Sequence, residues 1–133
     1  MKKRTSLPDT NFILRYLLRD NEEHFAEAAD FFEKVRVGSK LALISESVLV
    51  ECLYVLTKHY KVPRVEAAGT LGGLLIYKGI VNSDSDVLTK ALATFAESTL
   101  DPVDCILLHK AAVEGHTLMT FDKALLKRVA QTP

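Results

Sequence analysis

Short apolar runs alternate with longer segments of helical periodicity along the whole chain, and this alternation limits the folds open to it. Short strands are predicted at residues 4–8, 40–44, 79–82 and 116–120. Helices are predicted after Asp9, over residues 23–36, 45–58, 63–77, 85–98 and 101–115, and from residue 122 onward. Strands and helices in this order predict a parallel sheet with helices on both faces. The predicted fold class is therefore α/β, a three-layer α/β/α sandwich with a short-stranded parallel central sheet.

The length and composition fit one globular domain over residues 1–133. Hydrophobic residues make up 48% of the chain and charged residues 26%, so it can bury a core and is not expected to be disordered. No apolar run reaches the ~18 residues of a membrane helix, and Pro8 and Asp9 interrupt the stretch after the basic start, so no leader is expected. Cys52 and Cys105 lack zinc-site spacing and suit small buried side chains. We expect a reduced, cytoplasmic protein without a membrane span.

The charges balance, with 17 basic and 17 acidic residues. A chain without excess positive charge is not an obvious nucleic-acid binder. If some of the acids gather to hold a metal ion, however, the basic residues are left free to face phosphate. Zero net charge then no longer argues against a nucleic-acid partner. The placement of the acids therefore decides which class of partner fits.

Glu51 is the acid that is hardest to explain as an ordinary surface residue. It stands in the run Val48-Leu49-Val50-Glu51-Cys52-Leu53-Tyr54, and a helix that is apolar all round is expected to be buried. An ionised carboxylate there needs a partner, because an unpaired buried charge costs several kcal/mol. Three interpretations stay open: an escape to solvent, a buried salt bridge, and a functional carboxylate.

Three aspartates stand at predicted helix starts. Asp9 and Asp122 each follow a predicted strand and precede a helix, and Asp104 lies three residues after Asp101 in the first turn of another. Aspartate is a preferred N-cap, and Asp101 with Asp104 can form a capping box, so each has an ordinary structural explanation. As a set they indicate more, because open parallel sheets bind their ligands at the carboxyl ends of the strands.

Four carboxylates gathered in one place need compensation. Two unit charges ~4 Å apart repel by about 4 kcal/mol at an effective dielectric of ~20. A hard divalent cation such as Mg²⁺ or Mn²⁺ prefers oxygen ligands and removes that repulsion. The residues alone therefore suggest a site for one or two metal ions, held by Asp9, Glu51, Asp104 and Asp122.

The same four acids carry a resemblance to the PIN-domain family. Asp9-Thr10-Asn11 resembles the opening of that family, and Ser47 to Cys52 resembles the segment with its second acid. Asp101-Pro102-Val103-Asp104 resembles the third segment, and Thr120-Phe121-Asp122-Lys123, the most specific signal, resembles the fourth. Gly115 to Met119 fits the glycine and strand that come before it. The resemblance covers nearly the whole chain, and its size and layout match the VapC-type toxin ribonucleases.

This resemblance implies an endoribonuclease that cleaves single-stranded or looped RNA with Mg²⁺ or Mn²⁺. The implied catalytic residues and metal ligands are Asp9, Glu51, Asp104 and Asp122. The residues expected to orient these ligands or a water molecule are Asn11, Ser47, Asp101 and Thr120. The bases that could contact the RNA backbone are Arg15, Arg19, Lys123 and Lys127, although an ordinary solvated face is the preferred explanation for each.

The resemblance also implies partners. A VapBC-type toxin–antitoxin pair contains a small antitoxin protein that blocks the acidic pocket. A homodimer is expected as well, because the apolar residues Leu71, Leu74, Leu75, Ile76 and Tyr77 form a denser run than one small sheet can cover. The alternative is a compact monomer with this run in its core.

Three other functions stay open. They are a non-toxin PIN nuclease in RNA processing, a non-catalytic PIN-fold interaction module, and a haloacid-dehalogenase-like phosphatase. The phosphatase class expects a second aspartate two residues after the first, where this chain has Asn11. The four histidines show no metal-ligand spacing and are expected at the surface.

Overall fold

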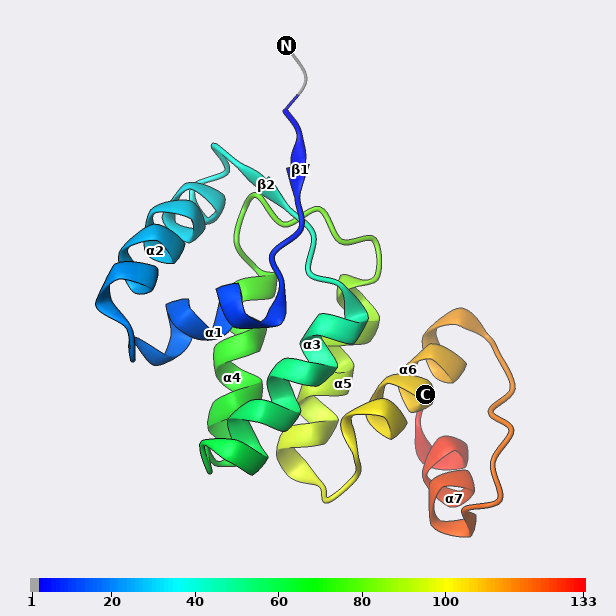
Figure 1. The fold of residues 1–133 in the computed structure, drawn as a ribbon. Helices are drawn as coiled ribbons and strands as arrows, with labels where there is room; N and C mark the ends of the chain where they lie inside the picture. The colour runs from blue at the N-terminus through cyan, green and yellow to red at the C-terminus, as the bar shows by residue number, and fades with distance from the viewer. Residues whose placement is uncertain (1–2) are drawn as a thin grey trace.

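The computed structural model describes residues 3–133, and helices dominate it (Figure 1). The elements in chain order are β1 (Thr5–Ser6), α1 (Thr10–Leu18), α2 (Glu22–Arg36), β2 (Leu41–Ala42), α3 (Glu46–Tyr54), the π-helix η1 (Val55–His59), α4 (Arg64–Leu75), α5 (Ser85–Glu97), α6 (Pro102–Glu114) and α7 (Lys123–Gln131). The predicted helices are all present in this part of the chain, with boundaries shifted by a few residues. The strands are much shorter than predicted.

The sheet is parallel, as predicted, but small. β1 pairs with β2 in the register Thr5 to Leu41 and Ser6 to Ala42, and Ile80 adds a single parallel bridge to Ala42. The strand predicted at 79–82 is therefore reduced to one bridge. The strand predicted at 116–120 is wrong for this structure, because that segment is an unpaired loop. An α/β fold with a small parallel sheet is what the structure supports, and a third layer stays a prediction.

Local chemistry explains why the strands end so early. Pro8 has no N–H to continue the ladder, and Asp9 directly after it caps α1. At the other edge, the backbone of Gly79 passes so close to residue 40 that an added Cβ would lie 2.0 Å from the carbonyl oxygen of Lys40. The N–H of Gly79 donates to the carbonyl of Val35 at 2.8 Å. Only glycine lets the chain cross β2 at this distance.

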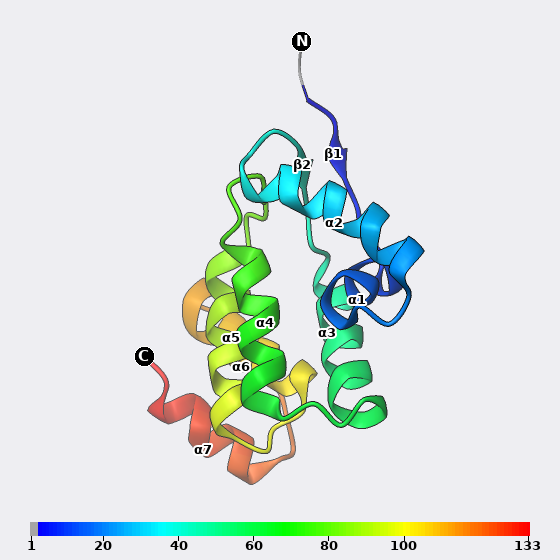
Figure 2. The same cartoon turned by 90° about the vertical axis from the view of Figure 1, so that its left-hand side faces the viewer.

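The core lies among the helices rather than on the sheet. α4, α5 and α6 pack side by side, and α1, which packs on α2 and α3, brings an aromatic group to the same core (Figure 2). The ring of Phe32 stacks on Tyr16 with centroids 4.7 Å apart. Leu71, Leu74 and Leu75 are buried in this core. The three leucines of the apolar run are therefore core, although Ile76 in the same run is 79% exposed. The run does not form a continuous uncovered surface, so that argument for a dimer is wrong, and the homodimer itself stays a prediction.

The chain after α6 leaves the body of the molecule. Gly115 ends α6 in the left-handed conformation with φ +69°, and an extended segment then runs to α7 along the outside of the helices (Figures 1 and 2). On this segment Met119 is 86% exposed and Phe121 is fully exposed. α7 itself buries only Leu125. No helix within residues 3–133 has the length and apolar character needed to cross a membrane.

Candidate active site

Asp9 and Asp122 both cap helices, so the capping interpretation is confirmed for each. The Oδ1 atom of Asp9 accepts a hydrogen bond from the N–H of Phe12 at 2.9 Å, and Oδ1 of Asp122 accepts one from Leu125 at 3.1 Å. Both side chains are exposed. Each capping bond engages one oxygen of a group that has two. A cap at a helix start and a ligand for a cation are therefore compatible roles for both residues.

Glu51 lies at the surface of α3, so the expectation that it is buried is wrong. The buried face of α3 consists of Leu49, Cys52 and Leu53, and Val48 and Val50, which precede Glu51, are only half-buried. Burial, and then the negative charges of Glu51 and Asp9, raise the pKa of the Cys52 thiol to about 12. Glu51 and Asp9 therefore share one neighbourhood, where α1 packs on α3.

The other acids gather at the start of α6. Asp104 is half-exposed in the first turn, and its pKa is raised by burial and then by the negative charges of Asp101 and Asp122. Burial together with Asp101 and Asp104 also raises the pKa of Tyr54 on α3. The predicted capping box is absent from this structure, because the Asp101 side chain makes no capping bond. Three acids from two helix starts thus share one negatively charged region.

α3 lies between these two acid groups. Glu51 and Tyr54 are three residues apart and so on one side of the helix, with Asp9 near the first and the α6 acids near the second. Within residues 3–133, no three side chains among His, Cys, Asp and Glu are close enough together to hold a metal ion. Joint metal binding by the four predicted acids therefore remains a prediction.

The residues predicted to assist the acids are found at the same ends of the helices. The Thr120 hydroxyl accepts a hydrogen bond from the N–H of Asp122 at 3.0 Å, which holds the turn before α7. Ser47 is exposed, its hydroxyl lies 2.9 Å from that of Ser45, and both line a cleft of about 510 Å³ that reaches Val103 beside Asp104. Asn11 and Asp9 line a second cavity of about 270 Å³.

The four predicted RNA-binding bases divide into two kinds. Arg15 pairs with Asp20 at 3.2 Å, and the guanidinium of Arg19 lies 4.6 Å from the centre of the Phe25 ring. Both arginines are therefore engaged within the protein. Lys123 and Lys127 are exposed on α7, just after Asp122, and they are the better placed to meet a phosphate.

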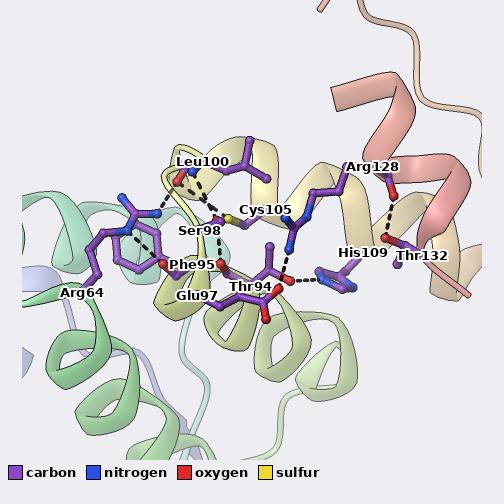
Figure 3. A network of polar contacts seen from close by, with 10 residues as sticks. All are labelled: Arg64, Thr94, Phe95, Glu97, Ser98, Leu100, Cys105, His109, Arg128 and Thr132. Atoms are coloured by element: carbon purple, nitrogen blue, oxygen red, sulfur yellow. Dashed lines mark hydrogen bonds and ion pairs between the residues drawn. The ribbon is translucent and has the colours of Figure 1, made fainter. Parts of the chain in front are cut away.

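Sequence reasoning missed the polar network that fixes the start of α6 (Figure 3). Arg64 donates from Nε to the carbonyl of Phe95 at 2.9 Å and from Nη2 to that of Leu100 at 2.5 Å. Its guanidinium also covers the Phe95 ring at 3.6 Å. One arginine thereby ties α4 to the end of α5 and to the turn that leads into Asp101.

His109 is the second residue of this network that was missed, and its expected surface position is wrong. Its side chain is buried, and Nε2 lies 2.7 Å from the Thr94 hydroxyl on α5. The signal was available in the sequence, because His109 follows Cys105 by four residues and so lies on the apolar side of the helix. The network joins α5 and α6 next to the acids but contains none of them.

The comparison with protein families identifies the chain. The PIN domain family model matches residues 6–131, which is nearly the whole sequence, and the chain belongs to this family. PIN domains are generally nucleases, so a nuclease is the function class that family membership supports. No curated protein and no solved structure matches the chain.

The acids can be tested against the divalent ions that PIN domains typically use. Asp9, Glu51, Asp104 and Asp122 supply only carboxylate oxygens, which suit Mg²⁺ and Mn²⁺. Burial, and then the negative charges of Asp101 and Asp122, raise the pKa of Asp104. The donor chemistry therefore fits a hard cation. The spacing of the side chains in this structure does not yet form a ligand set.

Proposed function

We propose that this single PIN-like domain is a metal-dependent endoribonuclease that cleaves single-stranded or looped RNA. The observation that carries the proposal is the acid group at the start of α6, where burial and the charges of Asp101 and Asp122 raise the pKa of Asp104, next in sequence to Val103 on the wall of an open cleft. A cluster of negative charges would repel the RNA phosphates unless a cation lay between the acids and the RNA. Membership of a nuclease family supports the same conclusion.

The chemistry assigns each residue a task. A divalent ion bound by Asp9, Glu51, Asp104 and Asp122 would polarise the scissile phosphate and lower the pKa of a water molecule. If Asp104 held the ion with one carboxylate oxygen, its second oxygen would be left to accept the proton of the attacking water. The water oxygen bonds to phosphorus, the bond from phosphorus to the 3′ oxygen breaks, and that oxygen takes up a proton.

The remaining predicted residues position these groups. Thr120 holds the turn that carries Asp122, and Ser47 and Asn11 line the two cavities beside the acids. Lys123 and Lys127 offer exposed positive charge to the RNA backbone. An exposed cleft suits this function, because an RNA chain can enter it from the side.

A cleavage assay on single-stranded RNA tests this function. The protein is expected to cut in Mn²⁺ or Mg²⁺ and to stop in EDTA. Asp9→Asn should lower the rate at least about 100-fold, because the amide removes a charged ligand, while asparagine keeps the helix cap. Asp84→Asn, at the N-cap of α5, is the matched control and should cut normally. Cleavage that persists in EDTA, or an active Asp9→Asn protein, would contradict the mechanism.

The biological setting we propose is a VapBC-type toxin–antitoxin pair, with a small antitoxin protein covering the acidic cleft. PIN nucleases act on RNA and often pair with antitoxins. A non-toxin nuclease of RNA processing would use the same residues. Co-expression with the product of a neighbouring small reading frame separates the two, because an antitoxin should relieve growth arrest and abolish cleavage.

One observation favours a non-catalytic interaction module as the second candidate. Asp9 and Asp122 are accounted for as helix caps, and no metal-holding group is found within residues 3–133. Such a module would bind RNA or protein without cutting RNA in any metal. A phosphatase of the haloacid-dehalogenase class has less support, since Asn11 replaces its second aspartate.

A further inference from the structure

The extended segment from Thr117 to Phe121 leaves its two largest side chains, Met119 and Phe121, open to solvent, while Leu118 and Thr120 are half-buried. Met119 is 86% exposed, Phe121 is fully exposed, and the segment takes part in no strand pairing. Its sequence, Thr-Leu-Met-Thr-Phe, favours a strand. Two large apolar side chains held fully in water on a five-residue stretch indicate a surface that another chain covers.

A strand edge that could pair with this segment lies at the opposite end of the molecule. β1 is the outer strand of the sheet, because its one partner within residues 3–133 is β2. Beside its carboxyl end lies a cavity of about 330 Å³ lined by Leu7, Pro8, Phe12 and Phe31, and Leu7 is 73% exposed. An unpaired strand edge beside an apolar cavity is the usual acceptor of an added strand.

We propose that two copies of this chain pair by strand addition, with segment 117–121 of each docking in parallel on the β1 edge of the other. The segment does not pair with the β1 edge of its own protomer, since Figures 1 and 2 both place it far from β1. The two features are complementary, and a two-fold axis makes the exchange reciprocal. The exposed side chains of segment 117–121 in one copy would then be covered at the unpaired β1 edge of the other.

The area involved suits a stable dimer. A buried Phe side chain covers roughly 150–250 Å². Phe121 and Met119 on one side, and Leu7 with the aromatic cavity wall on the other, are used twice by the symmetry. The total is on the order of 1,000 Å² or more, which is the range of specific interfaces.

Strand addition would also build the acid site from two chains. Adjacent strands lie about 4.8 Å apart, Asp9 follows β1, and Asp122 follows segment 117–121. A parallel docking therefore brings Asp122 of one copy next to Asp9 of the other. This part of the inference rests on the proposed nuclease function, and it explains why residues 3–133 of one protomer show no group of side chains able to hold a metal ion.

The interface is tested first, without reference to activity. Sedimentation equilibrium of the full chain at micromolar concentration should give twice 14.8 kDa. Met119→Ser/Phe121→Ser should give a monomer with unchanged circular dichroism, because both side chains are exposed. Ile76→Ser, which removes a 79% exposed apolar residue on another face, is the matched control and should stay dimeric. A monomeric wild type, or a dimer that the double variant keeps, overturns the proposal.

The shared site is tested by mixing two inactive variants. If Asp9 and Asp122 of one site come from different chains, unfolding and refolding Asp9→Asn together with Asp122→Asn restores one complete site per mixed dimer. Random pairing makes half of the dimers mixed, so activity should return to about a quarter of the wild-type value. A dimer that shows no restoration overturns the shared site. A wild-type dimer with no nuclease activity refutes the proposed function and leaves the interface to be decided by sedimentation.

Discussion

At the scale of single residues, His109 is the buried group with the clearest electrical consequence. Its Nε2 atom meets the Thr94 hydroxyl, and its Nδ1 atom has no hydrogen-bond partner within residues 3–133. Burial lowers the pKa of this imidazole, and the positive charges of Lys90 and Arg128 lower it further. The folded protein therefore holds His109 in its neutral form and resists protonation there.

The stability of the protein should consequently fall on acidification below the ordinary histidine pKa of about 6.5. The unfolded chain takes up this proton first, so the unfolded state gains up to about 1.4 kcal/mol per pH unit from this one group. His109→Gln should reduce the slope of unfolding free energy between pH 7 and pH 5, measured by urea denaturation. His24→Gln, an exposed histidine of α2 replaced in the same way, should keep the wild-type slope. Equal slopes in wild type and His109→Gln would refute the assignment.

At the scale of elements, the small sheet depends on one close crossing. Gly79 donates its N–H to Val35, and its carbonyl accepts from the N–H of Ala42 at 2.9 Å. These bonds attach the chain after α4 to β2. A methyl group at Gly79 would meet the backbone of Lys40 at 2.0 Å, and a backbone atom cannot move aside as a flexible side chain can.

Gly79→Ala should therefore destabilise the fold by about 3 kcal/mol, which corresponds to a fall in melting temperature of roughly 10 °C. Gly69→Ala is the matched control. Gly69 lies within α4, and an added Cβ there meets nothing within 4 Å. Alanine should raise stability at that position by about 0.5–1 kcal/mol. Thermal denaturation of both variants measures the difference, and equal melting temperatures would mean that the crossing is not tight.

At the scale of the whole molecule, the acids around Asp104 form a region of concentrated negative charge. The ionised form of Asp104 is disfavoured in the folded state, since burial, Asp101 and Asp122 all raise its pKa. Above that pKa the repulsion destabilises the fold, and it is relieved as the pH falls. A cation that binds only the folded state should relieve it at neutral pH.

Mg²⁺ or Mn²⁺ should therefore raise the melting temperature, with a gain of about 2.7 kcal/mol at 100 times the dissociation constant. Asp104→Asn should melt higher than wild type in EDTA and should respond less to the metal. Asp86→Asn, in the first turn of α5, should leave the metal response unchanged. Differential scanning fluorimetry with and without metal measures both effects. A wild-type curve that metal does not move would favour the capping roles alone.

The sequence by itself determined the local structure of this protein. Helix starts at Asp9 and Asp122 followed from the preference of aspartate for N-caps, and both capping bonds are present. The end of α6 at Gly115 followed from the left-handed conformation that glycine tolerates. The parallel direction of the strands followed from the helices between them. These features depend on neighbouring residues, so a single sequence contains enough to predict them.

The tertiary structure decided the features that depend on which elements meet. The sequence run around Glu51 looks buried, but burial depends on what packs against each side of α3, and the side with Glu51 stays open. The apolar run over residues 71–77 looks like an interface, but its three leucines are buried in the core, where α4 packs on α5. His109 looks like one more polar residue until Thr94 on another helix gives it a partner. The side chains of residues 116–120 favour a strand, yet a strand forms only where a second backbone lies beside it. In this fold no strand within residues 3–133 of the same protomer lies beside the segment, so only another chain could pair with it.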